Sequence, residues 1–171
     1  PGPFPPVYSN PAILMWSLGS EWNINLFFKP GQFPTVLSAA QALESAAVQV
    51  KSFDSTHPVV SSYGTIVNKP NDVETYVNTS CLSVDVWSVN EYRGPGFSRT
   101  FDQWQAISGK PMFLGEYGID AYNTTAGSED QATHAQWVSW LWDEIVRNLY
   151  ANNPNNAALG GAVFEWNDDW W

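Results

Sequence analysis

The chain has 171 residues, 44% of them hydrophobic and 15% aromatic, with 17 acidic against 7 basic residues and a formal net charge of −10. This composition excludes a disordered chain, which has few aromatic and hydrophobic residues, and argues against nucleic-acid binding, which needs a basic surface. No apolar run approaches the roughly 20 residues that cross a bilayer. The length favours one globular domain, and the charge and hydropathy argue that its partners are neither nucleic acids nor membranes.

The hydrophobic pattern alternates between strands and helices along the chain. After a Pro-rich lead-in over residues 1–11, the apolar run from Ala12 to Leu18 is typical of a parallel strand covered on both faces. The other elements that we predict are a helix over 35–53, strands over 57–63 and 85–89, a short helix over 97–107, a strand over 111–114, a helix opened by a capping box at Ser128–Gln131 and ending near 152–154, and a strand over 160–164. This alternation predicts an α/β fold with a parallel sheet.

Carboxylates and aromatic side chains follow the predicted strands at their carboxyl ends. These segments are Glu21–Asn23, Asn90–Arg93, Glu116–Gly118 and Glu165–Asp169. Because such ends lie on one face of a parallel α/β fold, we expect the carboxylates to converge there among aromatic rings. Sugar hydrolysis needs two carboxyl groups, one protonated and one ionised. Aromatic rings suit the C–H faces of pyranoses, and the few basic residues fit a neutral substrate.

Four segments resemble the motifs of a known enzyme family. PAILMWSLGSEWN (residues 11–23) and KPMFLGEYG (110–118) resemble the acid/base and nucleophile segments of clan A glycoside hydrolases, most closely family 2, which includes β-galactosidases and β-glucuronidases. DVWSVNEYRG (85–94) and GGAVFEWNDDWW (160–171) are similar to the ends of its sixth and eighth strands. The resemblance implies a partial TIM (β/α)8 barrel covering strands four to eight, with parallel strands and helices outside.

Carried over to this chain, the resemblance implies a role for each matching residue. Glu21 is the general acid/base and Glu116 the nucleophile, so the implied reaction is retaining hydrolysis, or transglycosylation, of a neutral β-linked oligo- or polysaccharide without a cofactor or metal. Tyr92 hydrogen-bonds the nucleophile and helps to keep it ionised. The remaining implied substrate-binding residues are Ser20, Trp22, Asn90 and Trp166, of which Trp166 forms the floor of the site.

One residue departs from the family pattern. The acid/base Glu of clan A enzymes usually follows an Asn that contacts the sugar 2-hydroxyl, and here that residue is Ser20. Hydrogen bonds to this hydroxyl strengthen in the transition state, and Ser has a shorter reach. An alternative is therefore a catalytically weakened or inactive barrel that serves as a carbohydrate-binding or structural module of an extracellular assembly. A different parallel α/β architecture is a third interpretation.

The length bears on completeness, because a (β/α)8 barrel takes about 250 residues. Residues 1–171 match the C-terminal part of one such domain, without strands one to three and the last helix. An open half-barrel would leave two sheet edges uncovered, which soluble proteins avoid. We therefore expect an excerpt of a longer polypeptide, the alternative being a partner chain that completes the sheet.

The remaining polar and aromatic residues allow simpler interpretations. Glu91 and Glu165 either contribute to the site, or only order a loop or pair with Arg93. Asp168 and Asp169 either bind a cation or substrate or lie in a solvated loop. Trp137, Trp140 and Trp142 are expected to pack on the barrel or a partner, His134 to be exposed, and His57 and a buried Cys81 to have no catalytic role. Glycosylation motifs at Asn78 and Asn123 favour a secreted glycoprotein.

Overall fold

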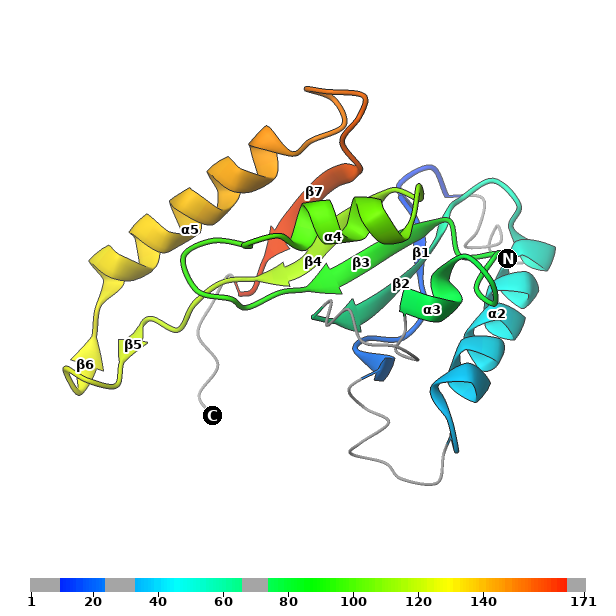
Figure 1. Cartoon of the computed structure of the whole chain (residues 1–171), viewed down its shortest axis with the longest axis horizontal. Helices are drawn as coiled ribbons and strands as arrows, with labels where there is room; N and C mark the ends of the chain where they lie inside the picture. Colours follow the sequence, from blue (N-terminus) through cyan, green and yellow to red (C-terminus); the bar gives the residue numbers. More distant parts are fainter. Residues whose placement is uncertain (1–9, 24–32, 66–73, 166–171) are drawn as a thin grey trace, which may run out of the picture. The chain divides into compact units, whose positions relative to one another are not determined.

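Five strands form one parallel sheet in a computed structural model that describes residues 10–23, 33–65 and 74–165 (Figure 1). In sheet order they are β1 (Trp16–Ser17), β2 (Val59–Gly64), β3 (Val86–Asn90), β4 (Met112–Tyr117) and β7 (Ala158–Val163). Helices alternate with these strands along the chain, so the predicted α/β fold is confirmed. The chain divides into two compact units, Pro1–Tyr63 with Asn68–Trp87 and Gly64–Val67 with Ser88–Trp171.

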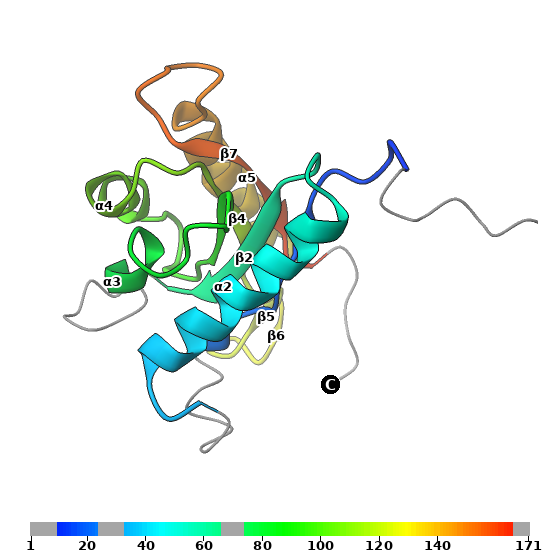
Figure 2. The ribbon, with the colours of Figure 1, turned by 90° about the vertical axis from the view of Figure 1, so that its right-hand side faces the viewer.

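The first unit contains β1, β2 and the helices α2 (Val36–Phe53) and α3 (Glu74–Val77). A capping box begins α2, because Thr35 accepts from the Ser38 amide and Ser38 accepts from the Thr35 amide, both at 3.1 Å. The helix buries Ala39, Ala40 and Ala47, and it runs across the front of β2 in Figure 2. These small residues let the helix approach its neighbours closely.

The end of α2 is attached to the strands by Asp54. Its carboxylate accepts hydrogen bonds from the Trp16 indole at 2.8 Å and from the Thr56 hydroxyl at 2.7 Å, and His57 Nδ1 lies 2.6 Å from it. The Trp16 bond, followed by those from Thr56 and His57, holds the pKa of Asp54 well below its usual range, although burial acts in the opposite direction. His57 therefore contributes to this structural cluster at the start of β2.

The second unit packs α5 (Gln131–Arg147) onto β7, which pairs with β4. Gly161 of β7 faces Ile145 of α5, and a Cβ at this position would lie 2.8 Å from Ile145 Cδ1, so a larger residue would force the side chains around it to move. The helix α4 (Thr100–Ile107) adds Phe101, which packs edge to face on Phe97, and Phe97 in turn packs on Tyr117. These rings form the apolar core of the unit.

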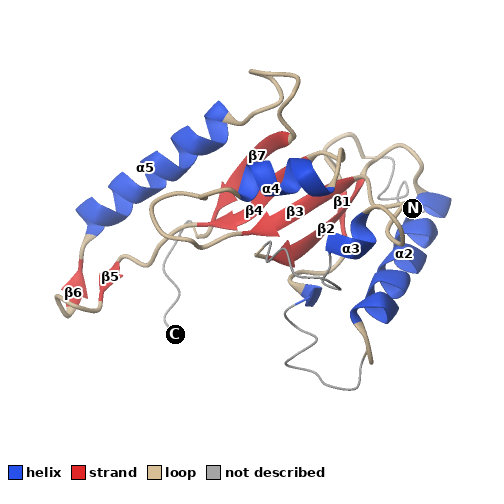
Figure 3. Cartoon of the chain, in the orientation of Figure 1, coloured by secondary structure: helices blue, strands red, loops and turns tan. Residues whose placement is uncertain are grey.

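A short hairpin of β5 (Tyr122–Asn123) and β6 (Ser128–Glu129) separates β4 from α5 (Figure 3). The predicted capping box at Ser128–Gln131 is therefore wrong, because Ser128 pairs with Asn123 in the hairpin. Asp130 caps α5 instead, and its carboxylate accepts from the Thr133 amide at 3.0 Å. This bond, with the Thr133 hydroxyl, lowers the pKa of Asp130.

Several boundaries differ from the sequence prediction. The first strand is limited to Trp16–Ser17, whereas residues 12–18 were expected. The last helix ends at Arg147 rather than near 152–154, because Asn148 caps it. Residues 1–9 of the lead-in and the predicted site residue Trp166, with Asp168 and Asp169, lie outside the described residues.

Candidate active site

The predicted nucleophile Glu116 is the penultimate residue of β4. Tyr92, in the loop after β3, donates its hydroxyl to Glu116 Oε2 at 2.9 Å, which is the contact that the family resemblance implies. The amide of Glu91 donates to the Glu116 carbonyl, also at 2.9 Å. Adjacent residues of one loop therefore hold both the backbone and the carboxylate of Glu116.

This loop is ordered by the carboxylate of Glu91, whose side chain is fully buried. It accepts from Arg93 Nε at 2.8 Å and from the hydroxyls of Thr65 and Thr100, each at 3.1 Å. Of the alternatives that the sequence left open for Glu91, the structure shows the pairing with Arg93. The full burial of Glu91 was not predictable from a polar loop segment, since the partners Thr65 and Thr100 belong to other parts of the chain.

The backbone beneath Glu116 is closely packed. A Cβ on Gly115 would lie 1.9 Å from Ser88 Oγ and 2.8 Å from Asn90 Oδ1, so a larger residue would push β4 away from β3. Asn90, predicted to bind substrate, is only 2% exposed at the end of β3. Burial also raises the pKa of Tyr117, which follows Glu116. The predicted nucleophile Glu116 thus follows a strand residue, Gly115, where packing against β3 leaves no room for a side chain.

The predicted acid/base Glu21 lies in the first unit, after β1. Its φ is +47°, a left-handed conformation that L residues with side chains adopt rarely and that concentrates at functional sites. Ser20 beside it is exposed. The indole of Trp22 donates to Ser61 Oγ at 3.1 Å, and that hydroxyl donates to the Leu18 carbonyl at 3.0 Å. The Ser61 hydroxyl therefore attaches the segment that carries Glu21 to β2.

The glycosylation motifs occupy two different settings. Asn78 is exposed just after α3. Asn123 is half-buried in β5, where its side-chain oxygen accepts from the amides of Thr125 and Ala126, each at 3.0 Å. Among the described residues, no group of three or more His, Cys, Asp or Glu could hold a metal ion, and no helix is long and apolar enough to cross a membrane.

Three solved structures resemble this chain in fold. The β-glucuronidase of Bacteroides uniformis matches 90% of this chain and 19% of its own, with a TM-score of 0.62 and 15% identity. The BuGH86wt protein, in complex with neoagarooctaose, matches 90% and 29%, with a TM-score of 0.57 and 13% identity. The endo-1,4-β-mannanase of Rhizomucor miehei matches 92% and 46%, with a TM-score of 0.50 and 17% identity.

The chain thus spans about a fifth to a half of the length of these proteins. No curated protein matches the sequence significantly. The five-stranded parallel sheet and these matches establish a partial TIM barrel, as predicted. Residues 8–167 match the model of the TIM barrel domain of glycosyl hydrolases family 2, and the chain belongs to this family.

Proposed function

We propose that the protein is a retaining β-glycoside hydrolase or transglycosylase that acts on a neutral β-linked carbohydrate. The hydrogen bond from Tyr92 to Glu116 Oε2 is the main support, because it orients the carboxylate of a family 2 barrel at the end of β4. In such barrels the ends of the strands carry the catalytic groups. The left-handed backbone of Glu21 supports a functional role for the second carboxylate.

In the proposed mechanism, Glu116 attacks the anomeric carbon and Glu21 donates a proton to the leaving glycosidic oxygen. The product is a glycosyl ester on Glu116, and the leaving group departs as an alcohol. Glu21 then removes a proton from a water molecule, or from a sugar hydroxyl in transglycosylation, and this oxygen displaces Glu116. A retaining mechanism requires the two carboxyl groups to be about 5–5.5 Å apart during the reaction.

The test is covalent trapping in the full-length protein. A slow 2-deoxy-2-fluoro β-glycoside with a good leaving group should add one glycosyl unit to the peptide that contains Glu116, as measured by mass spectrometry. Glu116→Gln should abolish labelling and turnover, whereas Asp102→Asn, at an exposed position in α4, should change neither. Labelling of a different carboxylate would refute the assignment of the nucleophile.

A second variant tests the acid/base role. Glu21→Ala should accumulate the glycosyl-enzyme with substrates that have good leaving groups, since its second step then lacks a base. Added azide needs no general base and should restore turnover. An azide-insensitive loss of activity would refute the role of Glu21.

The second candidate function is a carbohydrate-binding barrel without catalysis, and Ser20 favours it. In clan A enzymes the residue that contacts the sugar 2-hydroxyl is usually an Asn, whose side chain is longer than that of Ser. Binding of β-glycans without any turnover or labelling would support this alternative. If Ser20 only weakens catalysis, Ser20→Asn should raise kcat/KM. A decrease would show that Ser20 suits the natural substrate of the protein.

The proposal places the protein outside the cell, as a glycoprotein. The two glycosylation motifs support it, and Asn78 is exposed. Expression in a eukaryotic secretory host should yield protein whose mass falls after enzymatic deglycosylation. Asn78→Gln should remove part of that mass difference, and an unmodified secreted protein would refute the proposed glycosylation.

A further inference from the structure

The second unit contains a pocket of about 790 Å³ next to the loop that holds Glu116. Its walls come from the loop after β3, the segment between β4 and β5, the hairpin, the first half of α5 and the residues after β7. The volume lies within the range of roughly 300–1,000 Å³ that is usual for small-molecule sites. Of its lining residues, Tyr92 belongs to the candidate active site and Thr124 to the glycosylation motif at Asn123.

Aromatic side chains form much of the lining, and Trp137 of α5 is the largest of them. Trp137 is half-buried and lies close to Gly94, whose Cβ, if present, would be 3.8 Å from the indole ring. Tyr122 of the hairpin and Phe164 after β7 line the same space. The expectation that Trp137 packs on the barrel or on a partner is therefore incomplete, because Trp137 also lines the pocket.

Two other tryptophans of α5 provide a comparison. Trp140 and Trp142 are 47% and 45% exposed, and neither lines the pocket. The same helix thus presents chemically identical side chains inside and outside the pocket. A loss of ligand binding that occurs only when Trp137 is replaced would therefore come from the pocket and not from the general hydrophobicity of the helix.

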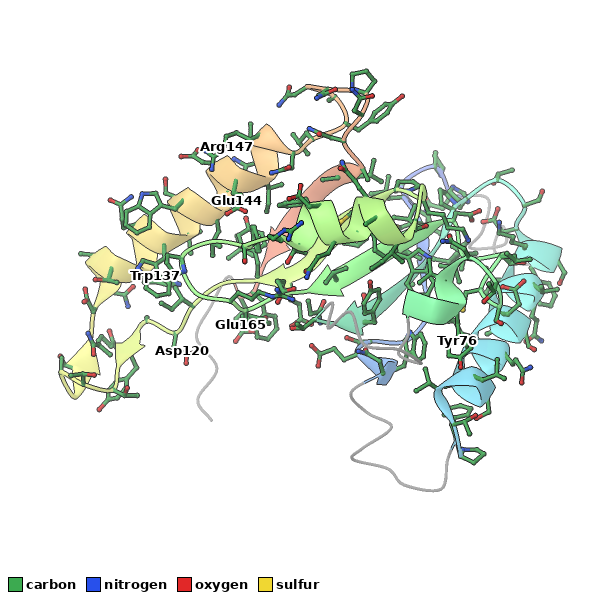
Figure 4. All side chains as sticks on the ribbon, in the orientation of Figure 1. Tyr76, Asp120, Trp137, Glu144, Arg147 and Glu165 are labelled. Atoms are coloured by element: carbon green, nitrogen blue, oxygen red, sulfur yellow. The ribbon has the colours of Figure 1, made fainter. Side chains whose placement is uncertain are left out.

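The charges around the pocket are mainly negative. Figure 4 shows Trp137 on α5, Asp120 after β4 and Glu165 after β7 in one region, and all three line the pocket with Glu129. Among the described residues of the lining, His134 is the only one with a basic side chain. Carboxylates accept hydrogen bonds from hydroxyl groups, but they repel the carboxylate of a uronic acid or the sulfate of an anionic glycan.

The walls are held in place by hydrogen bonds. Glu144 of α5 accepts from the Phe97 amide at 3.0 Å, which joins the helix to the loop after β3. The Asp130 amide donates to the Ala121 carbonyl at 2.7 Å, which joins the start of α5 to the segment after β4. Tyr92 both lines the pocket and donates to Glu116, so the pocket borders the candidate nucleophile.

We propose that this pocket is a subsite for an uncharged sugar unit of the substrate, in which the Trp137 ring packs on the C–H face of a pyranose and the surrounding carboxylates accept its hydroxyl groups. The proposal deepens the proposed function, on which the identification of the ligand as a glycan rests. It also predicts that anionic glycans are rejected, although the fold resembles a β-glucuronidase.

The test measures binding in the full-length Glu116→Gln protein, so that no substrate is consumed. Calorimetry would use neutral tetrasaccharides (laminari-, cello-, manno- and galactotetraose) and tetragalacturonic acid as the anionic counterpart. Trp137→Ala should weaken binding of the best neutral tetrasaccharide about tenfold, given the apolar area of one ring face. Trp140→Ala is the matched control and should bind like the parent. Trp137→Phe should recover most of the affinity and shows that the loss is not caused by misfolding.

Each outcome decides the proposal. Equal affinities of the Trp137→Ala and Trp140→Ala proteins would overturn it, even if the wild-type protein hydrolyses the substrate. It would also be overturned if no neutral tetrasaccharide binds or if tetragalacturonic acid binds more tightly than all of them. If binding depends on Trp137 but the wild-type protein shows no turnover, the sugar subsite is supported. Only the proposed enzymatic function is then contradicted.

Discussion

Replacing Glu91 with Gln removes a negative charge from a buried network and leaves its volume almost unchanged. The carboxylate accepts from Arg93 and from the hydroxyls of Thr65 and Thr100. Gln has one acceptor oxygen, and its NH2 group would face these donors. The substitution therefore separates the role of the charge from that of side-chain packing.

The size of the effect follows from the three contacts. Removing one partner of a buried ion pair destabilises a protein by about 3–5 kcal/mol. Arg93 is 26% exposed, so water solvates part of its freed charge. The single proton of the Thr100 hydroxyl is shared between Glu91 and the Phe97 carbonyl, and it can still be donated to that carbonyl, 2.8 Å away. We therefore expect the lower end, about 3 kcal/mol.

Hydrogen exchange of the full-length protein measures this change locally. Amides of β3 and β4 should exchange about 100-fold faster in the Glu91→Gln protein, since about 1.4 kcal/mol corresponds to a factor of ten. Turnover should fall as well, because the loosened loop carries the Glu91 amide and the Tyr92 hydroxyl, both of which donate to Glu116. Asp102→Asn breaks an exposed pair with Arg99 at 3.8 Å, and this control should change exchange little.

A double variant tests the cause. If an unpaired cation produces the loss, Arg93→Gln in the Glu91→Gln protein should restore part of the protection, and the effects of the two substitutions should not add. The reasoning would be refuted by strictly additive effects. It would also be refuted if Glu91→Gln were as harmless as Asp102→Asn.

Three further predictions concern single residues. Tyr92→Phe should lower kcat/KM about tenfold, because its hydroxyl donates a hydrogen bond to Glu116 Oε2, and a change below twofold would contradict this role. Gly115→Ala should lower the unfolding temperature and the activity, because its Cβ would collide with β3, whereas a Cβ on Gly109 would meet nothing within 4 Å and serves as the control. Asp54 has a lowered pKa mainly because of an indole N–H bond, so its stabilising effect is present at neutral pH and decreases once the pH falls below about 4, where the unfolded chain takes up the proton. Thermal unfolding between pH 2 and 7 should show a flatter profile for Asp54→Asn, and identical profiles would refute this reasoning.

The elements with strong local signals were predictable from the sequence. The helix over 36–53 follows from its apolar period, and the strands over 86–90 and 112–117 were predicted in part, over 85–89 and 111–114, from short apolar segments. The start of α5 was not predictable, because Ser128 and Asp130 can both cap a helix. The choice depends on the pairing of Tyr122 with Glu129, a contact between residues that no local pattern specifies.

The residues of the candidate site likewise divide into those that local sequence motifs predict and those that depend on contacts between distant segments. The motifs marked Glu116 and Tyr92, and the structure adds the hydrogen bond between them. The burial of Glu91 and the pocket beside Trp137 depend on segments that are distant in the sequence, so helix periodicity alone assigned Trp137 to packing. The roles of Glu21, Ser20 and Trp22 remain predictions from the family resemblance.

The buried Glu91 network also bears on the choice between an enzyme and an inactive barrel. A buried ion pair contributes little net stability, and well-packed hydrophobic residues of similar volume often do as well or better. The network is therefore poorly explained as a device for stability. What it does provide is a fixed position for the loop whose next residue, Tyr92, donates to the carboxylate of Glu116. The nucleophile role that we propose for Glu116 requires an oriented carboxylate, whereas a glycan-binding module needs only a surface of suitable shape, so the network fits the proposed enzyme better than the inactive barrel.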